Sequence, residues 1–157
     1  MSTDDFSFKK AHYAVLQQSS MVDPYIEEHK KILLSEFLEK SEAWITRDHM
    51  NTFGSWLRKL LMHNMNISEQ LFLLSRGPSW NILTYQGYEI NGNSFYTIAQ
   101  DKKSTNQNSG VRMDATDNNG KKDTYYGYIE EIWELDYGPN FKVPYFVANG
   151  LSYLEEG

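Results

Sequence analysis

Apolar residues in the first half of the chain recur at the three- and four-residue spacing of amphipathic helices. This pattern predicts one helix over residues 24–39 and a second over residues 47–63. The apolar stripes of the two helices comprise Ile26, Ile32, Leu33, Leu34, Phe37 and Leu38, and Met50, Phe53, Leu57, Leu60 and Leu61. Because each stripe needs a packing partner, we expect the helices to pack together. Upstream, the run HYAVLQQS (12–19) alternates weakly and predicts a short extended lead-in.

Capping residues mark where these helices begin and end. Asp23-Pro24 supplies an N-cap acceptor followed by proline at the first helical position, and Thr46 is the candidate cap of the second helix. Ser68 precedes a third, short helix, which Gly77-Pro78 ends. We therefore predict that residues 1–78 form a helical segment of two to three helices.

After residue 78 the pattern changes to that of β-strands, with β-branched and aromatic residues in short runs. Five runs stand out: WNILTYQGYEI, SFYTIAQ, VRMDA, TYYGYIEEIWELDY and FKVPYFVAN. Asn91-Gly92 and Asn119-Gly120 supply the positive φ angles of tight hairpins, whereas residues 101–110 form a longer polar loop. The pattern predicts about five antiparallel strands over residues 79–157.

Together these segments predict an α+β fold that forms one compact unit. Five short strands cannot bury a flat sheet unaided, so we expect a small, barrel-like antiparallel sheet of SH3-like size with the helices packed on it. In the longest strand, alternate positions divide into two faces. We expect the core to take Tyr125, Ile129, Trp133, Leu135 and Tyr137, and the outer face to carry Tyr126, Tyr128, Glu130, Glu134 and Asp136.

Composition and charge narrow the classes of function. The 157 residues carry a net charge of −6, which disfavours nucleic acid as a partner, because binding of DNA through its phosphates needs concentrated Lys and Arg. The chain has no cysteine, so no disulfide or thiolate site is expected. Neither a signal peptide nor an apolar run of about 18 residues occurs. We expect a soluble, intracellular protein, nuclear or cytoplasmic, that does not bind membranes.

Two long runs resemble plant CACTA-type transposases in the domains of unknown function downstream of the catalytic core. They are LSRGPSWNILTYQGYEINGNSFYTIAQDKKSTNQNSGVRMDA and YYGYIEEIWELDY. VDPYIEEHKKILL and FGSWLRKLL are similar to the end of the preceding domain of those proteins, so the resemblance covers roughly residues 10–149. It implies a transposon-derived accessory region without the catalytic domain. The chain departs from the family's F-K-C-x-W ending, because it reads FVANG at 146–150.

Motifs for catalysis, cofactors and metals are not supported by the sequence. A calcium loop aligned on Gly120 places Ala115 first and Tyr126 where a bidentate Glu is needed. No phosphate-binding glycine loop and no nucleophile elbow occurs. The histidines lack the i, i+4 spacing of a helical zinc site, although folding could bring two of them together; they are His12, His29, His49 and His63. We therefore predict no enzyme activity, no cofactor and no metal.

The strongest candidates for binding lie on the longest predicted strand. Tyr126 and Tyr128 beside Glu130 and Glu134 could hold a basic or methylated lysine side chain, and Trp133 is a further candidate. The alternative is that the helices cover the tyrosines and that the carboxylates are only solvated. The pairs Lys102-Lys103 and Lys121-Lys122 could contact a phosphate backbone, but we favour solvated loop charge, because no Arg cluster or run of stacking aromatic residues accompanies them.

Three hypotheses for function follow from the sequence. The first is a non-catalytic, transposon-derived protein-interaction module that binds a host protein or self-associates, as a regulatory or selfish element. The second is a nucleic-acid-binding accessory domain, whose binding would depend on salt. The third is an enzyme with an unrecognised site.

Overall fold

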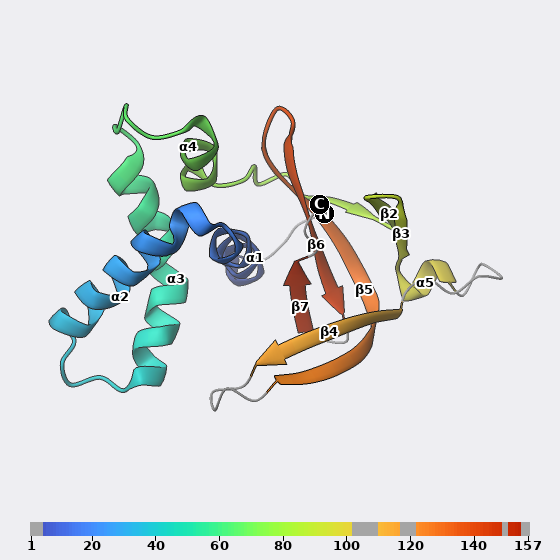
Figure 1. Cartoon of the computed structure of the whole chain (residues 1–157), viewed down its shortest axis with the longest axis horizontal. Coiled ribbons are helices and arrows are strands. Elements are labelled where there is room, and N and C mark those ends of the chain that lie inside the picture. The colour runs from blue at the N-terminus through green and yellow to red at the C-terminus, as the bar shows by residue number, and fades with distance from the viewer. Residues whose placement is uncertain (1–4, 102–109, 117–121, 149–150, 155–157) are drawn as a thin grey trace. The chain divides into compact units, whose positions relative to one another are not determined.

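The computed structural model describes residues 5–101, 110–116, 122–148 and 151–154, and side chains within 5–100 and 128–148. The fold is α+β, with N-terminal helices and a C-terminal antiparallel sheet, as the sequence predicts (Figure 1). The chain divides into two compact units. A helical unit contains residues 1–82 and 135–143, and a β unit contains residues 83–134 and 144–157. No helix of the described part is both long and apolar enough to cross a membrane.

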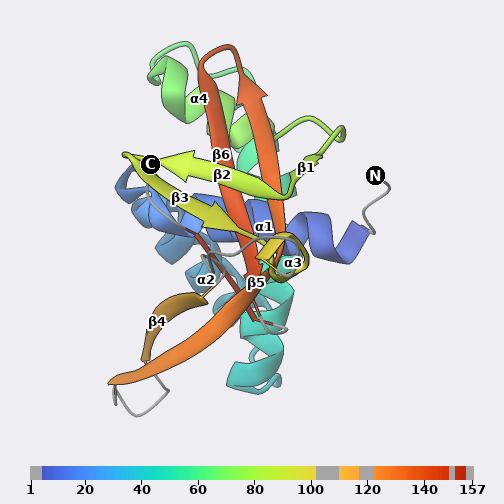
Figure 2. The same cartoon turned by 90° about the vertical axis from the view of Figure 1, so that its right-hand side faces the viewer.

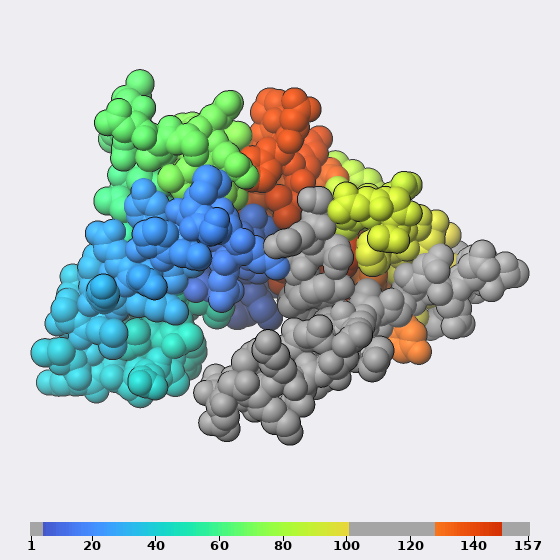
Figure 3. Space-filling model, viewed as in Figure 1, coloured from blue at the N-terminus to red at the C-terminus, as the bar shows by residue number. Residues whose placement is uncertain are grey.

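The described part of the helical unit contains four α-helices and a short 3-10 helix. They are α1 (Asp5–Gln18), η1 (Ser20–Val22), α2 (Asp23–Glu36), α3 (Glu42–Leu61) and α4 (Glu69–Arg76). Helix α3 contacts α1, α2 and α4, so it is the centre of the unit. In Figure 3, α2 in light blue forms the near face of this unit. The buried apolar side chains of the helices include Phe8, Leu16, Leu33, Phe53, Leu57, Leu61, Leu71 and Leu74.

The extended lead-in predicted for residues 12–19 is wrong, because residues 5–18 form helix α1. Its buried positions, Phe8, Ala11, His12, Val15 and Leu16, have helical spacing. One of the five is a histidine, which interrupts the apolar pattern in the sequence. Helix α1 therefore places His12 in the interior of the helical unit.

Two predicted helix starts also need correction. Asp23 does not cap α2, because η1 runs directly into this helix and Asp23 is its first residue. Thr46 does not cap α3, which begins at Glu42. Its cap is Ser41, whose hydroxyl accepts a hydrogen bond from the backbone N–H of Trp44 at 3.1 Å. The predicted stripes are partly exposed as well, at Leu34, Phe37, Leu38 and Leu60.

The predicted start and end of the third helix are confirmed in α4. The hydroxyl of Ser68 accepts a hydrogen bond from the backbone N–H of Leu71 at 3.1 Å. Gly77 ends the helix with a positive φ of 89°. The serine thus satisfies one of the backbone donors that a helix start leaves without a partner.

Replacing this cap should weaken the helical unit measurably. We expect Ser68→Ala to lower the free energy of unfolding by about 1 kcal/mol, because an N-cap acceptor is lost. Urea denaturation followed by far-UV circular dichroism measures the change. Ser55→Ala, within α3 and outside any cap, is the matched control. An equal loss in the two variants would contradict the role of Ser68.

The β unit contains strands β1 (Leu83–Tyr85), β2 (Gly87–Ile90), β3 (Asn93–Tyr96), β4 (Gly110–Thr116), β5 (Lys122–Gly138), β6 (Phe141–Ala148) and β7 (Leu151–Leu154), and the short helix α5 (Ile98–Asp101). Strands β5 and β6 contribute residues 135–143 to the helical unit. Within the β unit, Figures 1 and 2 show β4 and the first half of β5 as a two-stranded ribbon.

The predicted barrel is not closed by the strands that the structure describes. One sheet has the order β1-β5-β6-β7, with β4 also paired to β5, and β2 and β3 form a separate hairpin. The physical reason is the length of β5, because β4 pairs with its residues 122–128 and β1 with its residues 132–134. The Asn91-Gly92 turn of the β2–β3 hairpin is confirmed, with φ angles of 51° and 81°. Asn119-Gly120 lies outside the described residues.

The two faces predicted for β5 agree with the burial of its described side chains. Ile129, Trp133, Leu135 and Tyr137 are buried, whereas Tyr128 and Glu130 are exposed. Ile132 departs from this alternation, since it is buried with Ile90, Ile129 and Phe146 in the core of the β unit. Glu134 and Asp136 are half-buried.

The tip of the β5–β6 hairpin is held in the helical unit by three polar contacts. The backbone N–H of Ser79 donates to the carbonyl of Asp136 at 2.8 Å. The guanidinium of Arg76 donates through Nη2 to the carbonyl of Tyr137 at 3.0 Å. Tyr137 Oη lies 2.9 Å from Nδ1 of His12. These contacts join residues far apart in sequence and place a tyrosine beside the buried histidine.

Candidate functional site: the His12 pocket

His12 is a buried histidine in its neutral form. Burial lowers the pKa of His12 from 6.5 to about 4, so it carries little positive charge at neutral pH. Burial also raises the pKa of its partner Tyr137 well above 10, so the phenol keeps its proton. The phenol has no other hydrogen-bond partner among the residues that the structure describes.

These protonation states determine which nitrogen of His12 carries the proton. If Tyr137 donates to Nδ1, the phenol hydrogen and Nδ1 are both satisfied, and Nε2 carries the imidazole proton. In the opposite arrangement the buried phenol hydrogen would lack an acceptor within the described part of the chain, at a cost of about 1–3 kcal/mol. The favoured tautomer therefore leaves Nε2–H as a hydrogen-bond donor.

Two glycines leave space around this donor. A Cβ at Gly54 would lie 3.2 Å from Cδ2 of His12 and 3.6 Å from Nε2. A Cβ at Gly77 would lie 3.7 Å from Nε2. Glycine within a helix is less stable than alanine by roughly 0.5–1 kcal/mol. The close approach of His12 gives a physical reason for Gly54 in the middle of α3.

A cavity of about 170 Å³ opens beside His12, and we call it the His12 pocket. Every residue that lines it belongs to the helical unit. Its wall brings together cations, aromatic rings and hydroxyls: Lys9, Arg58, Arg76, Phe8, Tyr13, Trp80, Ser55 and Ser75. The pocket therefore offers positive charge and hydrogen-bond donors next to an apolar surface.

The positive charge of the pocket is only partly neutralised. Lys9 forms an ion pair with Asp5 at 3.1 Å. Among the described residues, Arg58 and Arg76 form no ion pair. Asp136 lines an adjoining hollow with both arginines, and among the described residues it forms no ion pair with either; its Oδ1 accepts a hydrogen bond from the backbone N–H of Gly138 at 2.9 Å. Two guanidinium groups are thus left for an anion.

An aromatic stack forms one wall of the pocket. The rings of Phe8 and Trp80 lie 4.0 Å apart at 15°, so one face of the indole is covered by Phe8. Phe8 is buried, whereas Trp80 is 66% exposed. The second face of Trp80 is therefore open to a planar or apolar group of a ligand.

Tyr13 connects the His12 pocket to a pair of buried histidines, His29 and His49. Nδ1 of His29 lies 2.7 Å from Nδ1 of His49, and Nε2 of His49 lies 3.0 Å from Oη of Tyr13. Only one proton fits between the two Nδ1 atoms, so His29 and His49 cannot both be charged in this arrangement. Burial, together with His29 and Lys30, lowers the pKa of His49 to about 4. The described residues contain no group of three or more side chains suited to a metal.

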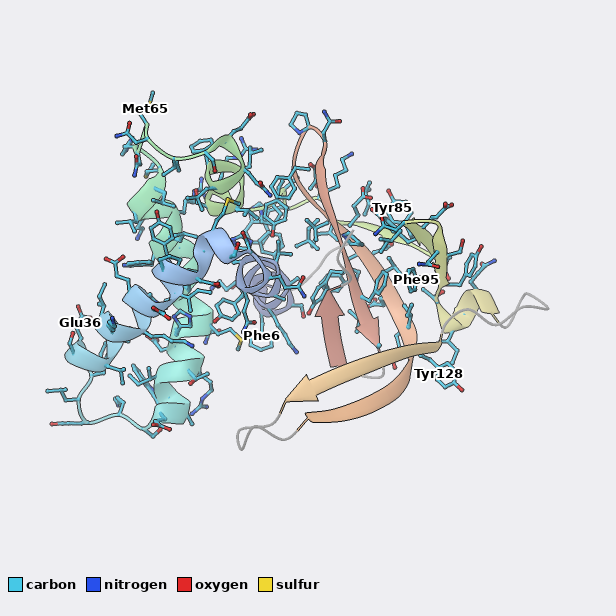
Figure 4. All side chains as sticks on the ribbon, viewed as in Figure 1. Phe6, Glu36, Met65, Tyr85, Phe95 and Tyr128 are labelled. Carbon is cyan, nitrogen blue, oxygen red and sulfur yellow. The ribbon has the colours of Figure 1, made fainter. Side chains whose placement is uncertain are left out.

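The predicted binding residues of the longest strand are not all exposed. Tyr128 is 52% exposed, and it lies apart from Tyr85 and Phe95 in Figure 4. The carboxylate of Glu134 accepts hydrogen bonds from Tyr88 at 2.7 Å and from Tyr85 at 3.4 Å, so its oxygens already have partners.

Trp133 is 5% exposed, and its indole N–H has no partner among the described residues. It therefore offers little surface to a ligand, whereas Glu130 is exposed. Four predicted features fall on side chains outside those described: Tyr126, the Asp114–Gly120 turn, Lys102-Lys103 and Lys121-Lys122. The predicted binding of a basic or methylated lysine side chain by this strand thus stays a prediction.

The His12 pocket is not predicted by the sequence, although one signal for it is present. Phe8 and His12 are four residues apart, which places them on one face of a helix. Interpreting residues 12–19 as extended hides this spacing. The contact between His12 and Tyr137 spans 125 positions and has no local signal.

Comparisons of the chain with protein-family models, with characterised proteins and with solved structures yield no match.

Proposed function

We propose that this chain is a non-catalytic protein-interaction module that binds an anionic segment of a partner protein in the His12 pocket. The observation that carries the proposal is the contrast in charge. The chain has a net charge of −6, yet this pocket is lined by three cations and one carboxylate, that of Asp5, which pairs with Lys9 and leaves Arg58 and Arg76 without an ion pair among the described residues. Arginine clusters of this kind recognise acidic or phosphorylated motifs in proteins.

The chemistry of His12 supports binding in preference to catalysis. A general base is most effective when its pKa lies near the working pH, and the pKa of His12 is about 4. Its hydrogen-bond partner is a buried phenol with a raised pKa, which makes a poor nucleophile at neutral pH. The imidazole is better suited to donate a hydrogen bond from Nε2.

The resemblance to the accessory region of plant CACTA-type transposases supports a transposon-derived origin. On this proposal the partner is a host protein or another copy of the chain, and the module acts in regulation or as a selfish element. A nucleic-acid accessory role would use the same arginines for phosphates of a nucleic acid. The test below separates these two kinds of partner.

Removing the two arginines should weaken binding of an acidic peptide to the full chain. We expect Arg58→Gln with Arg76→Gln to weaken binding of a dye-labelled, glutamate-rich peptide by about tenfold or more, because charge-assisted hydrogen bonds are lost. Fluorescence anisotropy measures the affinity. Lys31→Gln with Lys59→Gln removes the same charge from exposed helix positions that do not line the pocket, and should change little.

Two outcomes would count against this function. Equal losses in both double variants would mean that binding follows net charge alone and not the pocket. If a single-stranded DNA of matched charge bound and the peptide did not, with a steep dependence on salt, the nucleic-acid accessory role would replace the protein-interaction role.

A further inference from the structure

Three side chains with N–H donors line the same cavity, and each keeps at least one donor available to a ligand. Arg58 of α3, Arg76 of α4 and His12 of α1 line the His12 pocket. Arg76 is held at Nη2 by the carbonyl of Tyr137, which fixes the guanidinium while its remaining N–H groups stay available. His12 is held through Nδ1 by Tyr137, which leaves Nε2 for the ligand. The hairpin tip thus orients two of the three donors.

The charge of these donors fits a dianion better than a carboxylate. Arg58 and Arg76 carry two positive charges, and within the described residues neither has an ion pair. A carboxylate would neutralise one of them and offer two oxygens. A phosphomonoester carries about −1.5 to −2 charges at pH 7 and offers three terminal oxygens, one for each donor.

The size of the cavity limits the ligand to a single phosphate-sized group. A volume of about 170 Å³ is small beside the roughly 300–1,000 Å³ of pockets that enclose whole small molecules. The open face of Trp80 lies at the same pocket and can hold the residue next to the anion. A phosphorylated side chain within a peptide meets both conditions.

We propose that the His12 pocket binds the phosphate of a phosphorylated serine or threonine in the partner protein, held by Arg58, Arg76 and Nε2–H of His12. This inference rests on the proposed function and names the anion. It makes association conditional on a modification of the partner. The residue next to the phosphorylated side chain in the partner stacks on the open face of Trp80.

The test uses the full chain with three peptides of one sequence, which carry phosphoserine, glutamate or serine at the central position. We expect the phosphopeptide to bind about tenfold or more tightly than the glutamate peptide, since more charge-assisted hydrogen bonds form. The serine peptide should not bind measurably. Calorimetric titration gives the affinities, and free phosphoserine separates recognition of the phosphate from that of the peptide.

Variants locate the site. Arg58→Gln alone should weaken phosphopeptide binding, and it removes no hydrogen bond that the described residues make with this side chain. Lys59→Gln, one position along the same exposed stretch, is the matched control. Binding of a dianion beside the imidazole should also raise the pKa of His12 from about 4, which NMR titration of its ring protons detects.

The outcomes distinguish failure of this inference alone from failure of the function on which it rests. Equal affinities for the phosphoserine and glutamate peptides would overturn phosphate recognition while the binding of acidic segments stands. No binding of any peptide would overturn both. Phosphopeptide binding that is unchanged in Arg58→Gln and leaves the pKa of His12 in place would move recognition away from this pocket.

Discussion

Acidification from pH 7 to about pH 4.5 is expected to lower the free energy of unfolding by several kcal/mol. The cause is two histidines that the native chain buries in neutral form, because burial lowers the pKa of His12 and of His49 to about 4. In the unfolded chain both pKa values return to about 6.5, so the unfolded state binds protons that the native state does not.

The sign and the pH range follow from these values. The contribution of these histidines to the free energy of unfolding is fully present above pH 6.5 and is lost as the pH falls toward 4. The loss is on the order of 2 kcal/mol for each histidine by pH 4.5. Burial also lowers the pKa of His29, although Asp48 and Glu36 oppose this effect. A proton that reaches both Nδ1 atoms of the His29–His49 pair would force them apart from their separation of 2.7 Å.

Glutamine variants isolate the contribution of the histidines from that of titrating carboxylates. His12→Gln and His49→Gln should each flatten the dependence of stability on pH between 6.5 and 4.5. His63→Gln, at an exposed position after α3, should leave it unchanged. Guanidinium denaturation at a series of pH values measures the slopes. Parallel slopes for all four proteins would contradict burial of neutral histidines.

Phe53→Ala should be among the most destabilising substitutions in the helical unit. The ring of Phe53 is fully buried in α3, and its centroid lies 5.0 Å from that of His49 and 5.6 Å from that of His29. Tyr13 and Trp56 complete this aromatic cluster. Removing the ring leaves a cavity, and we expect a loss of about 3–5 kcal/mol in the free energy of unfolding.

A matched pair of variants on the same helix tests this packing. Leu60→Ala removes an apolar side chain that is 45% exposed, and its cost should stay below about 1 kcal/mol. Phe53→Leu keeps much of the volume and should cost about 1.5 kcal/mol. Urea denaturation gives all three values. A loss for Phe53→Ala no larger than that for Leu60→Ala would contradict its central place in the core.

Local signals predict the parts of the fold that depend on neighbouring residues. Ser68 and Gly77 mark α4 because a cap and a positive φ act within one turn of the helix. The Asn91-Gly92 turn predicts the β2–β3 hairpin for the same reason. Helix α1 escapes prediction because its buried stripe includes His12, a polar residue that becomes compatible with the interior only when Tyr137 supplies a partner.

Contacts between distant residues account for what the sequence does not predict. The alternation in β5 predicts its faces, but which strands pair along its 17 residues depends on contacts between residues far apart in sequence. The strands that the structure describes therefore form an open arrangement, where the sequence predicts a barrel. The same holds for the candidate site. His29 and His49 are 20 residues apart, and neither spacing nor charge predicts that their Nδ1 atoms meet.

The contribution of residues 135–143 to the helical unit constrains the order in which the protein can fold during synthesis. Residues 1–82 leave the ribosome first, but Tyr137, the partner of His12, follows only after the segment 83–134 has been made. Until then the imidazole lacks the phenol that satisfies Nδ1 in the finished interior. The helical unit therefore completes its core only after most of the β unit has been synthesised. A nascent chain arrested before residue 137 would expose an unfinished His12 pocket to chaperones and proteases.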